Sequence, residues 1–230
     1  GDTGYIVVDV PGNPSHCDLV IVELADPSHP VVTNRRVTLP GYTRDLKLVG
    51  GFAYIASDVA GLQIVDVRNP NLAPVLRGRV DTPGSAFGVS VSAGTAYIAD
   101  TTSIIAVNVS DPLNPFYAGS YGVSARSVVA QQTTVYSVDG VNLRVVDFAV
   151  PSRPSLIASA YSYEALRIDL FGSQVYLATP TSGGLYILGS NLQNLIAQIS
   201  IPFGTAAPGP VSVSGNLGIS ISFRFLFGSN

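Results

Sequence analysis

The sequence holds few side chains of the types that perform nucleophilic or metal chemistry. Its two histidines, His16 and His29, lie in turn-like segments near the N-terminus, and as a metal pair they would still need a third ligand. Cys17 follows His16 as a nucleophile beside a base would, but neighbouring residues of an extended chain point to opposite faces. We therefore expect solvated turn histidines and a surface or intermolecular thiol. The sequence predicts no catalytic and no metal-ligating residues.

Acidic residues recur at two places in the repeating pattern described below. They are Asp58, Asp100 and Asp139 after tyrosine-containing segments, and Glu23, Asp66 and Asp147, with Asn108 in register, at the ends of apolar runs. A bound calcium ion needs several oxygen atoms that converge on one point. One acid per repeat suits the capping of turns better. We predict no cofactor, with calcium as the alternative.

The spacing of the arginines is the strongest indication of a binding site. Arg44 and Arg126 each lie ten residues before a tyrosine of a recurring segment, and Arg167 lies nine residues before another. In the fold predicted below, this position begins the innermost strand, near one mouth of a central channel. Guanidinium groups around such a mouth would attract an anion or a carboxylate of a partner. The alternative is local pairing, for example with Asp45 or Glu164.

These positions belong to an internal repeat. Five apolar runs start 43, 42, 39 and 42 residues apart: LVIVEL at 19–24, LQIVDV at 62–67, IIAVNV at 104–109, LRVVDF at 143–148 and LYILGS at 185–190. A tyrosine precedes the last four runs, in segments such as AYIAS and AYIAD, at Tyr54, Tyr97, Tyr136 and Tyr176. A double-proline segment, such as ADPSHP or SDPLNP, follows the first four. Three markers in constant order indicate a repeat architecture.

Each repeat contains four strand-like runs. In the second repeat they are 42–49, 52–56, 62–67 and 75–80. Gly50-Gly51 joins the first two as a hairpin turn. Pairs such as Asp26-Pro27 indicate turns, because proline fixes φ and the acidic side chain caps the turn. Four-stranded units of this size are typical of propeller blades, so we predict an all-β fold, a β-propeller of about five to six four-stranded antiparallel blades.

The motifs resemble a known family. LVIVEL, LQIVDV and LRVVDF are each preceded by a strand similar to YIAD and followed by a double-proline turn. In this they are similar to the repeats of the LVIVD-repeat β-propeller family. The resemblance is strongest in the second repeat, and LYILGS in the fifth has lost the acidic residue. It implies a β-propeller, often secreted or attached to the cell surface, and it implies no reaction.

The two ends of the chain do not match a finished ring. We predict a single domain, 1–230, with repeats of roughly 5–41, 42–84, 85–123, 124–162, 163–204 and a partial 205–230. The first repeat lacks a candidate for the innermost strand, whereas the tail offers three strands at 211–214, 217–222 and 223–227. The tail either completes the first blade or forms a sixth, partial blade. Otherwise the chain is an incomplete ring or part of a larger propeller.

The composition of the chain limits the classes of partner that it can bind. The chain has 230 residues, of which 12% are charged, a formal net charge of −3 and a single lysine, Lys47, which argues against binding to nucleic acid. No apolar run has the length of a transmembrane helix. We expect protein partners in a larger assembly and an extracytoplasmic location, whether periplasmic, secreted or at the cell surface. Because position 1 is not methionine, we expect a processed or excised chain.

The predicted function is that of a non-enzymatic scaffold for protein–protein interaction or structural assembly. One alternative is a carbohydrate-binding adhesin that recognises a surface glycan, although most tyrosines lie at repeat positions and are expected in the core. The other is a hydrolase or lyase with an active site in the channel. The tail segment FRFLF, at 223–227, is a candidate for strand addition to a partner.

Overall fold

The computed structural model describes residues 3–10, 13, 15–179, 184–189, 192, 195–200, 207–214 and 218–224. These residues form twenty-one strands: β1 (Thr3–Asp9), β2 (His16–Glu23), β3 (Val31–Pro40), β4 (Asp45–Val49), β5 (Phe52–Ala56), β6 (Leu62–Asp66), β7 (Val75–Val80), β8 (Ala86–Ser92), β9 (Thr95–Asp100), β10 (Ile104–Asn108), β11 (Phe116–Tyr121), β12 (Ser127–Gln131), β13 (Thr134–Val138), β14 (Asn142–Asp147), β15 (Ser155–Tyr161), β16 (Arg167–Phe171), β17 (Gln174–Thr179), β18 (Gly184–Gly189), β19 (Leu195–Ser200), β20 (Ala207–Ser214) and β21 (Gly218–Arg224). Over these ranges there is no helix, and hence none long and apolar enough to cross a membrane.

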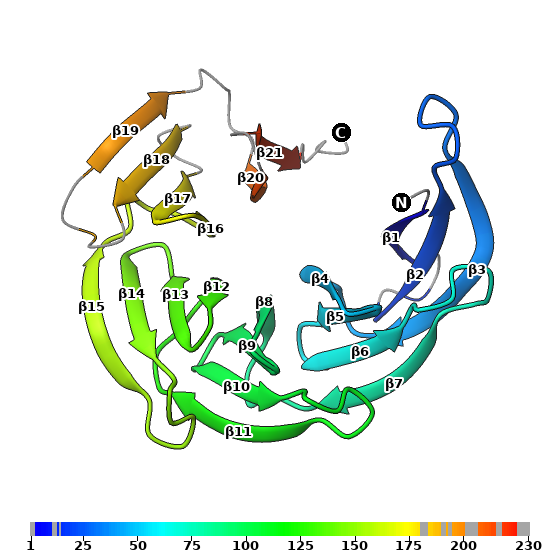
Figure 1. Ribbon diagram of the computed structural model, residues 1–230, viewed down its shortest axis with the longest axis horizontal. Coiled ribbons are helices and arrows are strands. Elements are labelled where there is room, and N and C mark those ends of the chain that lie inside the picture. The colour runs from blue at the N-terminus through cyan, green and yellow to red at the C-terminus, as the bar shows by residue number, and fades with distance from the viewer. Residues whose placement is uncertain are drawn as a thin grey trace.

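The strands form antiparallel sheets that follow one another around an axis. The first sheet is β1-β2-β3, the second to fifth are β4–β7, β8–β11, β12–β15 and β16–β19, and the sixth is β20-β21. In each four-stranded sheet the first strand lies nearest the axis and the last lies on the outer rim (Figure 1). The ring stays open between the last strands and the first (Figure 1). The predicted all-β propeller is therefore confirmed, in the form of an incomplete ring.

The ends follow the prediction in part. The first sheet starts with β1, which pairs only with β2, so it has no strand in the innermost position among the described residues. The tail forms its own two-stranded sheet, with β20 packed beside β16 and β17, instead of completing the first sheet. The predicted boundary at 223 is wrong, because the pairing of β21 with β20 continues through Phe223 and Arg224. The rest of the predicted strand, 225–227, lies outside the described residues.

Turn chemistry agrees with the sequence. Gly50 and Gly51 have φ of 59° and 79°, and Ala93 and Gly94 have φ of 48° and 73°. Two successive positive φ values define the two-residue hairpin turn whose twist matches that of its strands. Glycine is favoured there because it lacks the Cβ that makes this region costly for other residues.

The recurring acids cap turns. Each accepts a hydrogen bond from the backbone N–H two residues later, at distances of 2.7 to 3.2 Å: Asp26 from Ser28, Asp66 from Arg68, Asn69 from Asn71, Asn108 from Ser110, Asp111 from Leu113 and Asp147 from Ala149. In the second and third sheets, two such caps in succession lead the chain from the third strand to the outer strand. The residue that closes the LVIVD pattern is therefore a turn cap in the second to fourth sheets, as the sequence predicted, whereas Glu23 in the first sheet pairs with Arg35.

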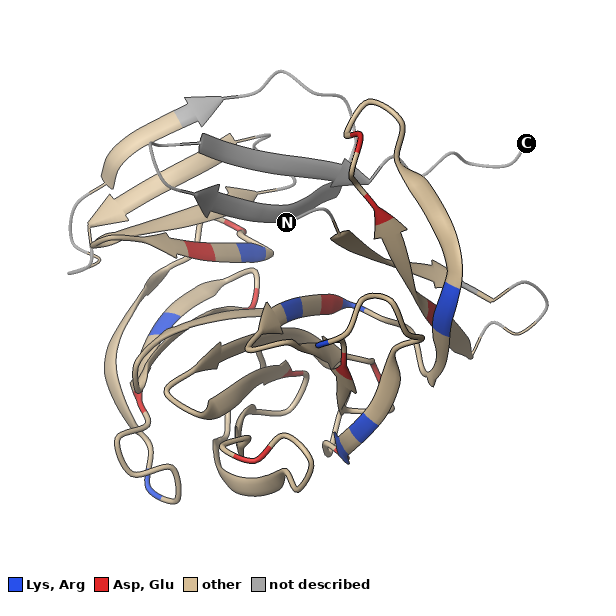
Figure 2. Ribbon diagram, turned by 45° about the vertical axis from the view of Figure 1, so that its right-hand side comes forward, with Lys and Arg blue, Asp and Glu red and all other residues tan. Residues whose placement is uncertain are grey.

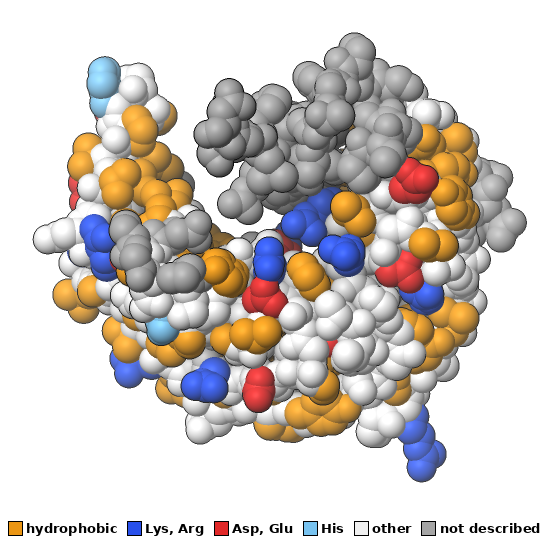
Figure 3. All heavy atoms as spheres, turned by 180° about the vertical axis from the view of Figure 1, so that it is seen from behind, with side chains coloured by type: hydrophobic (Ala, Val, Ile, Leu, Met, Phe, Trp, Pro, Cys, Tyr) orange, Lys and Arg blue, Asp and Glu red, His pale blue; other side chains and the backbone are white. Residues whose placement is uncertain are grey.

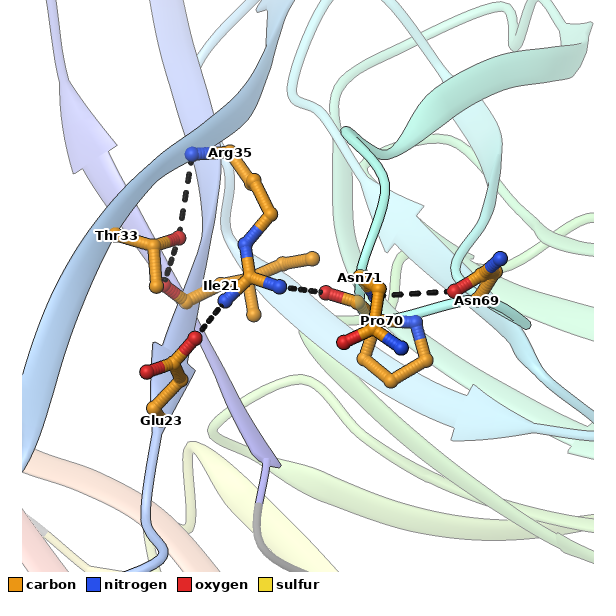
Figure 4. A network of polar contacts seen from close by, with 7 residues as sticks. All are labelled: Ile21, Glu23, Thr33, Arg35, Asn69, Pro70 and Asn71. Carbon is orange, nitrogen blue, oxygen red and sulfur yellow. Dashed lines mark hydrogen bonds and ion pairs between the residues drawn. The ribbon is translucent and has the colours of Figure 1, made fainter.

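The outer strand of one sheet meets the double-proline turn of the next. A Cβ added to Gly78 on β7 would lie 2.7 Å from the Pro112 carbonyl oxygen, and one added to Gly119 on β11 would lie 1.7 Å from that of Pro151. The equivalent position on β3 is Arg35, whose guanidinium donates to the Pro70 carbonyl and pairs with Glu23 (Figure 4). Close backbone approach at glycine, or one guanidinium bridge, thus joins neighbouring outer strands and turns.

The apolar core lies between neighbouring sheets. Separate buried clusters fill the interfaces between the first and second, second and third, third and fourth, and fourth and fifth sheets. All four repeat tyrosines are buried, as predicted: Tyr54, Tyr97 and Tyr136 in these interfaces, and Tyr176 in a further cluster with Ala178 and Leu185 of the fifth sheet. Figure 2 shows long stretches of ribbon without a charged residue, as expected of strands buried on both faces.

The prediction for Cys17 is wrong. The residue is 0% exposed, packed between the first two sheets with Leu19 and Leu39, and its Sγ lies 2.9 Å from Thr43 Oγ1. The reason is register: β2 begins at His16, so Cys17 already occupies a core-facing position of that strand. A buried cysteine thiol in such a position behaves as a small apolar residue.

Candidate anion site at the central opening

The predicted arginines lie at one end of the innermost strands. Arg44 directly precedes β4, Arg126 directly precedes β12, and Arg167 is the first residue of β16. The same backbone hydrogen bond to the neighbouring strand recurs in all three sheets: Arg44 N to Ala56 O (2.8 Å), Arg126 N to Val138 O (2.8 Å) and Leu166 N to Ala178 O (3.1 Å). The count of ten residues back from each tyrosine therefore found structurally equivalent positions, which are those of Arg44, Arg126 and Leu166. Arg167 lies one position later, in the register of Asp45 and Ser127.

Phe87 supplies the platform of the site. In the third sheet, Ala86 pairs with Asp100 and Gly88 with Ala99, so Phe87 is the extra residue of a β-bulge. The guanidinium carbons of Arg44 and Arg126 lie 5.3 and 5.2 Å from the centroid of its ring. Such contacts contribute roughly 0.5–1 kcal/mol each at exposed sites. One aromatic ring thus orients two guanidinium groups from the sheets on either side of it.

Arg167 completes the cluster. Ser127 Oγ accepts a hydrogen bond from the N–H of Ile168 at 3.3 Å, so the residues that directly precede these two, Arg126 and Arg167, are neighbours across two sheets. Burial lowers the pKa of Arg167, and the charges of Arg126 and Arg44 lower it further, against an opposing effect of Asp45. Figure 3 shows basic side chains gathered around the centre of the ring on one face. We call Arg44, Phe87, Arg126 and Arg167 the central cluster.

One carboxylate is paired within the central cluster. Asp58 Oδ2 accepts from Arg44 Nε at 3.0 Å and also from Arg44 Nη2. Of the ion pairs formed by described residues, this is the only one that involves a member of the cluster. The local partner of Arg44 is therefore Asp58, which follows the second strand of the same sheet, and not Asp45.

The Asp45 carboxylate binds backbone N–H groups of two strands. Its Oδ2 accepts from the N–H of Val89 on the next sheet at 3.0 Å, and its Oδ1 accepts from the N–H of Leu46 at 2.9 Å. Burial raises the pKa of Asp45, against the opposing charges of Lys47 and Arg167. The hydroxyl of Ser127, at the position equivalent to Asp45, accepts from Ile168 N at 3.3 Å, and that of Ser90, two positions further along its strand, accepts from Ala130 N at 3.0 Å. These side-chain bonds hold the innermost strands of four consecutive sheets together and so fix the spacing of the cluster.

The other repeated acids are bound by protein donors. Asp100 accepts from the N–H groups of Gly84 and Thr102, at 3.2 and 2.9 Å. Asp139 accepts from Asn142 N at 2.7 Å, Val141 N at 2.8 Å and Arg144 Nη1 at 2.7 Å. Among the residues whose side chains are described, no group of three or more His, Cys, Asp or Glu residues could hold a metal ion.

The environment of Asp139 predicts a loss of stability in acid. Burial alone would raise its pKa, but the hydrogen bonds from Asn142, Arg144 and Val141 outweigh burial and lower it from 3.8 to about 2. Because the pKa is lower in the folded state, this stabilisation is present above pH 4 and is lost as the pH falls from about 4 to about 2. We expect about 2 kcal/mol more loss between pH 5 and pH 2 for the wild type than for Asp139→Asn, measured by urea unfolding. Equal losses in the two proteins would contradict this assignment.

His16 and Cys17 do not form a catalytic pair. The ring of His16 has its Nδ1 3.2 Å from Ser15 Oγ, whereas the thiol of Cys17 points into the core. His29 is exposed within its double-proline turn and contacts Asp26 Oδ2 at 2.8 Å. His29 is thus the solvated turn residue that the sequence predicted, whereas the prediction of a turn is wrong for His16, which is the first residue of β2 and pairs with Pro40.

The fold and the central cluster define the class of protein, which is an open β-propeller with basic side chains at its central opening. Two adjacent segments, residues 40–82 and 83–123, match the LVIVD repeat, so the second and third sheets are LVIVD repeats and the sequence resemblance is confirmed there. A search of the curated proteins found no match.

Several solved structures share the fold. Hydrazine synthase of Kuenenia stuttgartiensis is 13% identical with a TM-score of 0.62, over 79% of this chain and 55% of that one. Apo AztD of Citrobacter koseri is 14% identical with a TM-score of 0.52, over 86% and 60%. Glutaminyl cyclase of Myxococcus xanthus is 9% identical with a TM-score of 0.53, over 80% and 92%. The chain thus spans little more than half the length of the first two. At such identities the likeness concerns the fold alone.

Proposed function

We propose that this protein is a non-enzymatic interaction module that docks a protein partner at its central opening, within a larger extracytoplasmic assembly. The observation that carries the proposal is the unequal use of charge. The repeated acids Asp58, Asp100 and Asp139 are bound by donors of the protein itself, whereas, among the described residues, only one of the three guanidinium groups of the central cluster, that of Arg44, forms an ion pair. A rigid, basic opening of this kind favours binding over turnover.

Apolar side chains on the outer rim support the proposal. The outer strands begin with exposed apolar residues in each of five sheets: Val31 and Val32, Val75, Phe116 and Tyr117, Leu156 and Ile157, Leu195 and Ile196. Exposed apolar patches of a folded protein commonly mark surfaces for other proteins. The repeated placement offers further contact area to neighbours in an assembly.

The mass of the native particle tests the proposal. The protein is purified from its source without denaturation and the intact particle is weighed by native mass spectrometry. We expect a particle that contains at least one different polypeptide in a fixed ratio. A lone copy of this polypeptide under gentle conditions and low salt would contradict the proposal.

A further inference from the structure

The second sheet carries its own ligand for the central cluster. Asp58 follows β5 with a positive φ of 49°, which turns its carboxylate back over Arg44. One oxygen of that carboxylate accepts from both Nε and Nη2 of the guanidinium. Aspartate is among the residues that tolerate this backbone conformation. The pair shows how a carboxylate binds at this end of an innermost strand.

The fourth and fifth sheets lack this internal ligand. In the fourth sheet, Asp139 after β13 is directed to Asn142 and Arg144 on the outward side of its own turn. Asp139 lies one position before Gly140, which holds the position that Asp58 has in the second sheet. In the fifth sheet, Thr179 corresponds to Asp139, and its hydroxyl contacts the backbone of Gly184; the position of Asp58 falls on residue 180, outside the described residues. In the part of the chain that the structure describes, neither sheet therefore forms an ion pair between a carboxylate of its own and the adjacent arginine, Arg126 or Arg167, as Asp58 does with Arg44.

We propose that Arg126 and Arg167 bind carboxylates of an acidic peptide segment of a partner protein, in the way that Asp58 binds Arg44. This inference rests on the proposed function and names the chemistry of the partner. A guanidinium group offers a planar fork of donors that matches a carboxylate. Arg126 is already oriented by the Phe87 ring and Arg167 is partly buried beside it, so less side-chain freedom is lost on binding.

Apolar residues flank the acidic positions of the proposed ligand. Val59 and Val141 lie in the turns that follow β5 and β13, and their side chains are 73% and 61% exposed. These turns begin at Asp58 and Asp139, beside the positions of Arg44 and Arg126. A segment in which acidic residues alternate with apolar ones would therefore contact both the guanidinium groups and the valines.

Calorimetric titration with a blocked tetra-aspartate peptide tests the proposal, with inorganic phosphate as a second probe. We expect the peptide to bind the wild type at low salt and to weaken as salt is added. Binding should weaken at least about tenfold in the double variant Arg126→Gln/Arg167→Gln. Arg153→Gln, which removes one positive charge from an exposed double-proline turn, is the control for the loss of a charge elsewhere and should leave binding unchanged.

A second variant is expected to bind the peptide more tightly, not more weakly. Asp58→Asn removes the internal carboxylate and frees the Arg44 guanidinium, so peptide binding should tighten about threefold or more. A structural role of these arginines would produce no gain of this kind. Circular dichroism of each variant establishes that it is folded.

Three results would overturn the proposal: no peptide binding to the folded wild type, equal binding by the double variant, or tighter binding of phosphate than of peptide. Each differs from the failure of the proposed function. If the native particle contains a partner that stays bound to the double variant, the docking function holds and the carboxylate assignment is wrong. If the particle is a lone chain, the docking function is wrong whatever the peptide does.

Discussion

Replacement of Gly119 by alanine is expected to lower the free energy of unfolding by about 3 kcal/mol, the upper end of the usual cost of overpacking. The new Cβ would lie 1.7 Å from the carbonyl oxygen and 2.4 Å from the carbonyl carbon of Pro151. These are backbone atoms of a turn that proline makes stiff, so no side chain can rotate away. Strand β11 and the turn of the fourth sheet must separate to admit a single methyl group.

The matched control lies three residues away. Gly122 has no heavy atom within 4 Å of an added Cβ and is not among the glycines with positive φ. Gly122→Ala should therefore leave stability within about 0.5 kcal/mol of the wild type. Urea unfolding of both variants measures the difference. If Gly119→Ala unfolded at the same urea concentration as the wild type, the contact between β11 and the Pro151 turn would not require glycine at this position.

Replacement of Tyr97 by alanine is expected to lower the free energy of unfolding by about 3–5 kcal/mol. The side chain is 1% exposed and fills the interface between the third and fourth sheets. Its ring packs edge-on against Phe148, with centroids 5.3 Å apart. Truncation would leave a cavity in an interface that also sets the spacing of the innermost strands.

Two further variants identify which part of Tyr97 matters. Its hydroxyl is 3.5 Å from the Gln132 carbonyl oxygen, at the limit of a hydrogen bond. Tyr97→Phe should therefore cost no more than about 1 kcal/mol. Tyr117→Ala makes the same truncation at a side chain that is 55% exposed and should change stability by about 0.5 kcal/mol or less. If Tyr97→Phe were as damaging as Tyr97→Ala, the hydroxyl and not the ring would be the essential part.

These variants address the way in which the repeats are joined. Neighbouring sheets meet through an apolar interface, through side-chain bonds between innermost strands, and through the contact of an outer strand with a proline carbonyl. In two interfaces that last contact is made by a glycine, Gly78 or Gly119, and in the first it is made by Arg35. A ring left open at one side has fewer such interfaces, so each of them matters more to its stability.

The sequence determined the repeat, the four strands of each blade and the turns between them. Strand alternation, hairpin turns such as Gly50-Gly51 and caps such as Asp66 depend on residues within a few positions of one another, so they are visible in a short window of the chain. The missing innermost strand of the first sheet followed from the same count. The equivalence of Arg44 and Arg126 also followed, because the repeat length is nearly constant.

Only the tertiary structure decided what these residues meet. It showed that Asp58 pairs with Arg44, that Phe87 lies between two arginines, and that Cys17 is buried. The count of ten residues back from Tyr97 gives Phe87, at the position that arginine holds in the second and fourth repeats. The sequence alone gave no reason to connect this phenylalanine with the arginines. The bulge that projects its ring and the turn that redirects Asp58 are local departures from the repeat. Contacts between sheets join residues tens of positions apart, and their partners depend on the distances and angles at which the sheets pack, which no local pattern records.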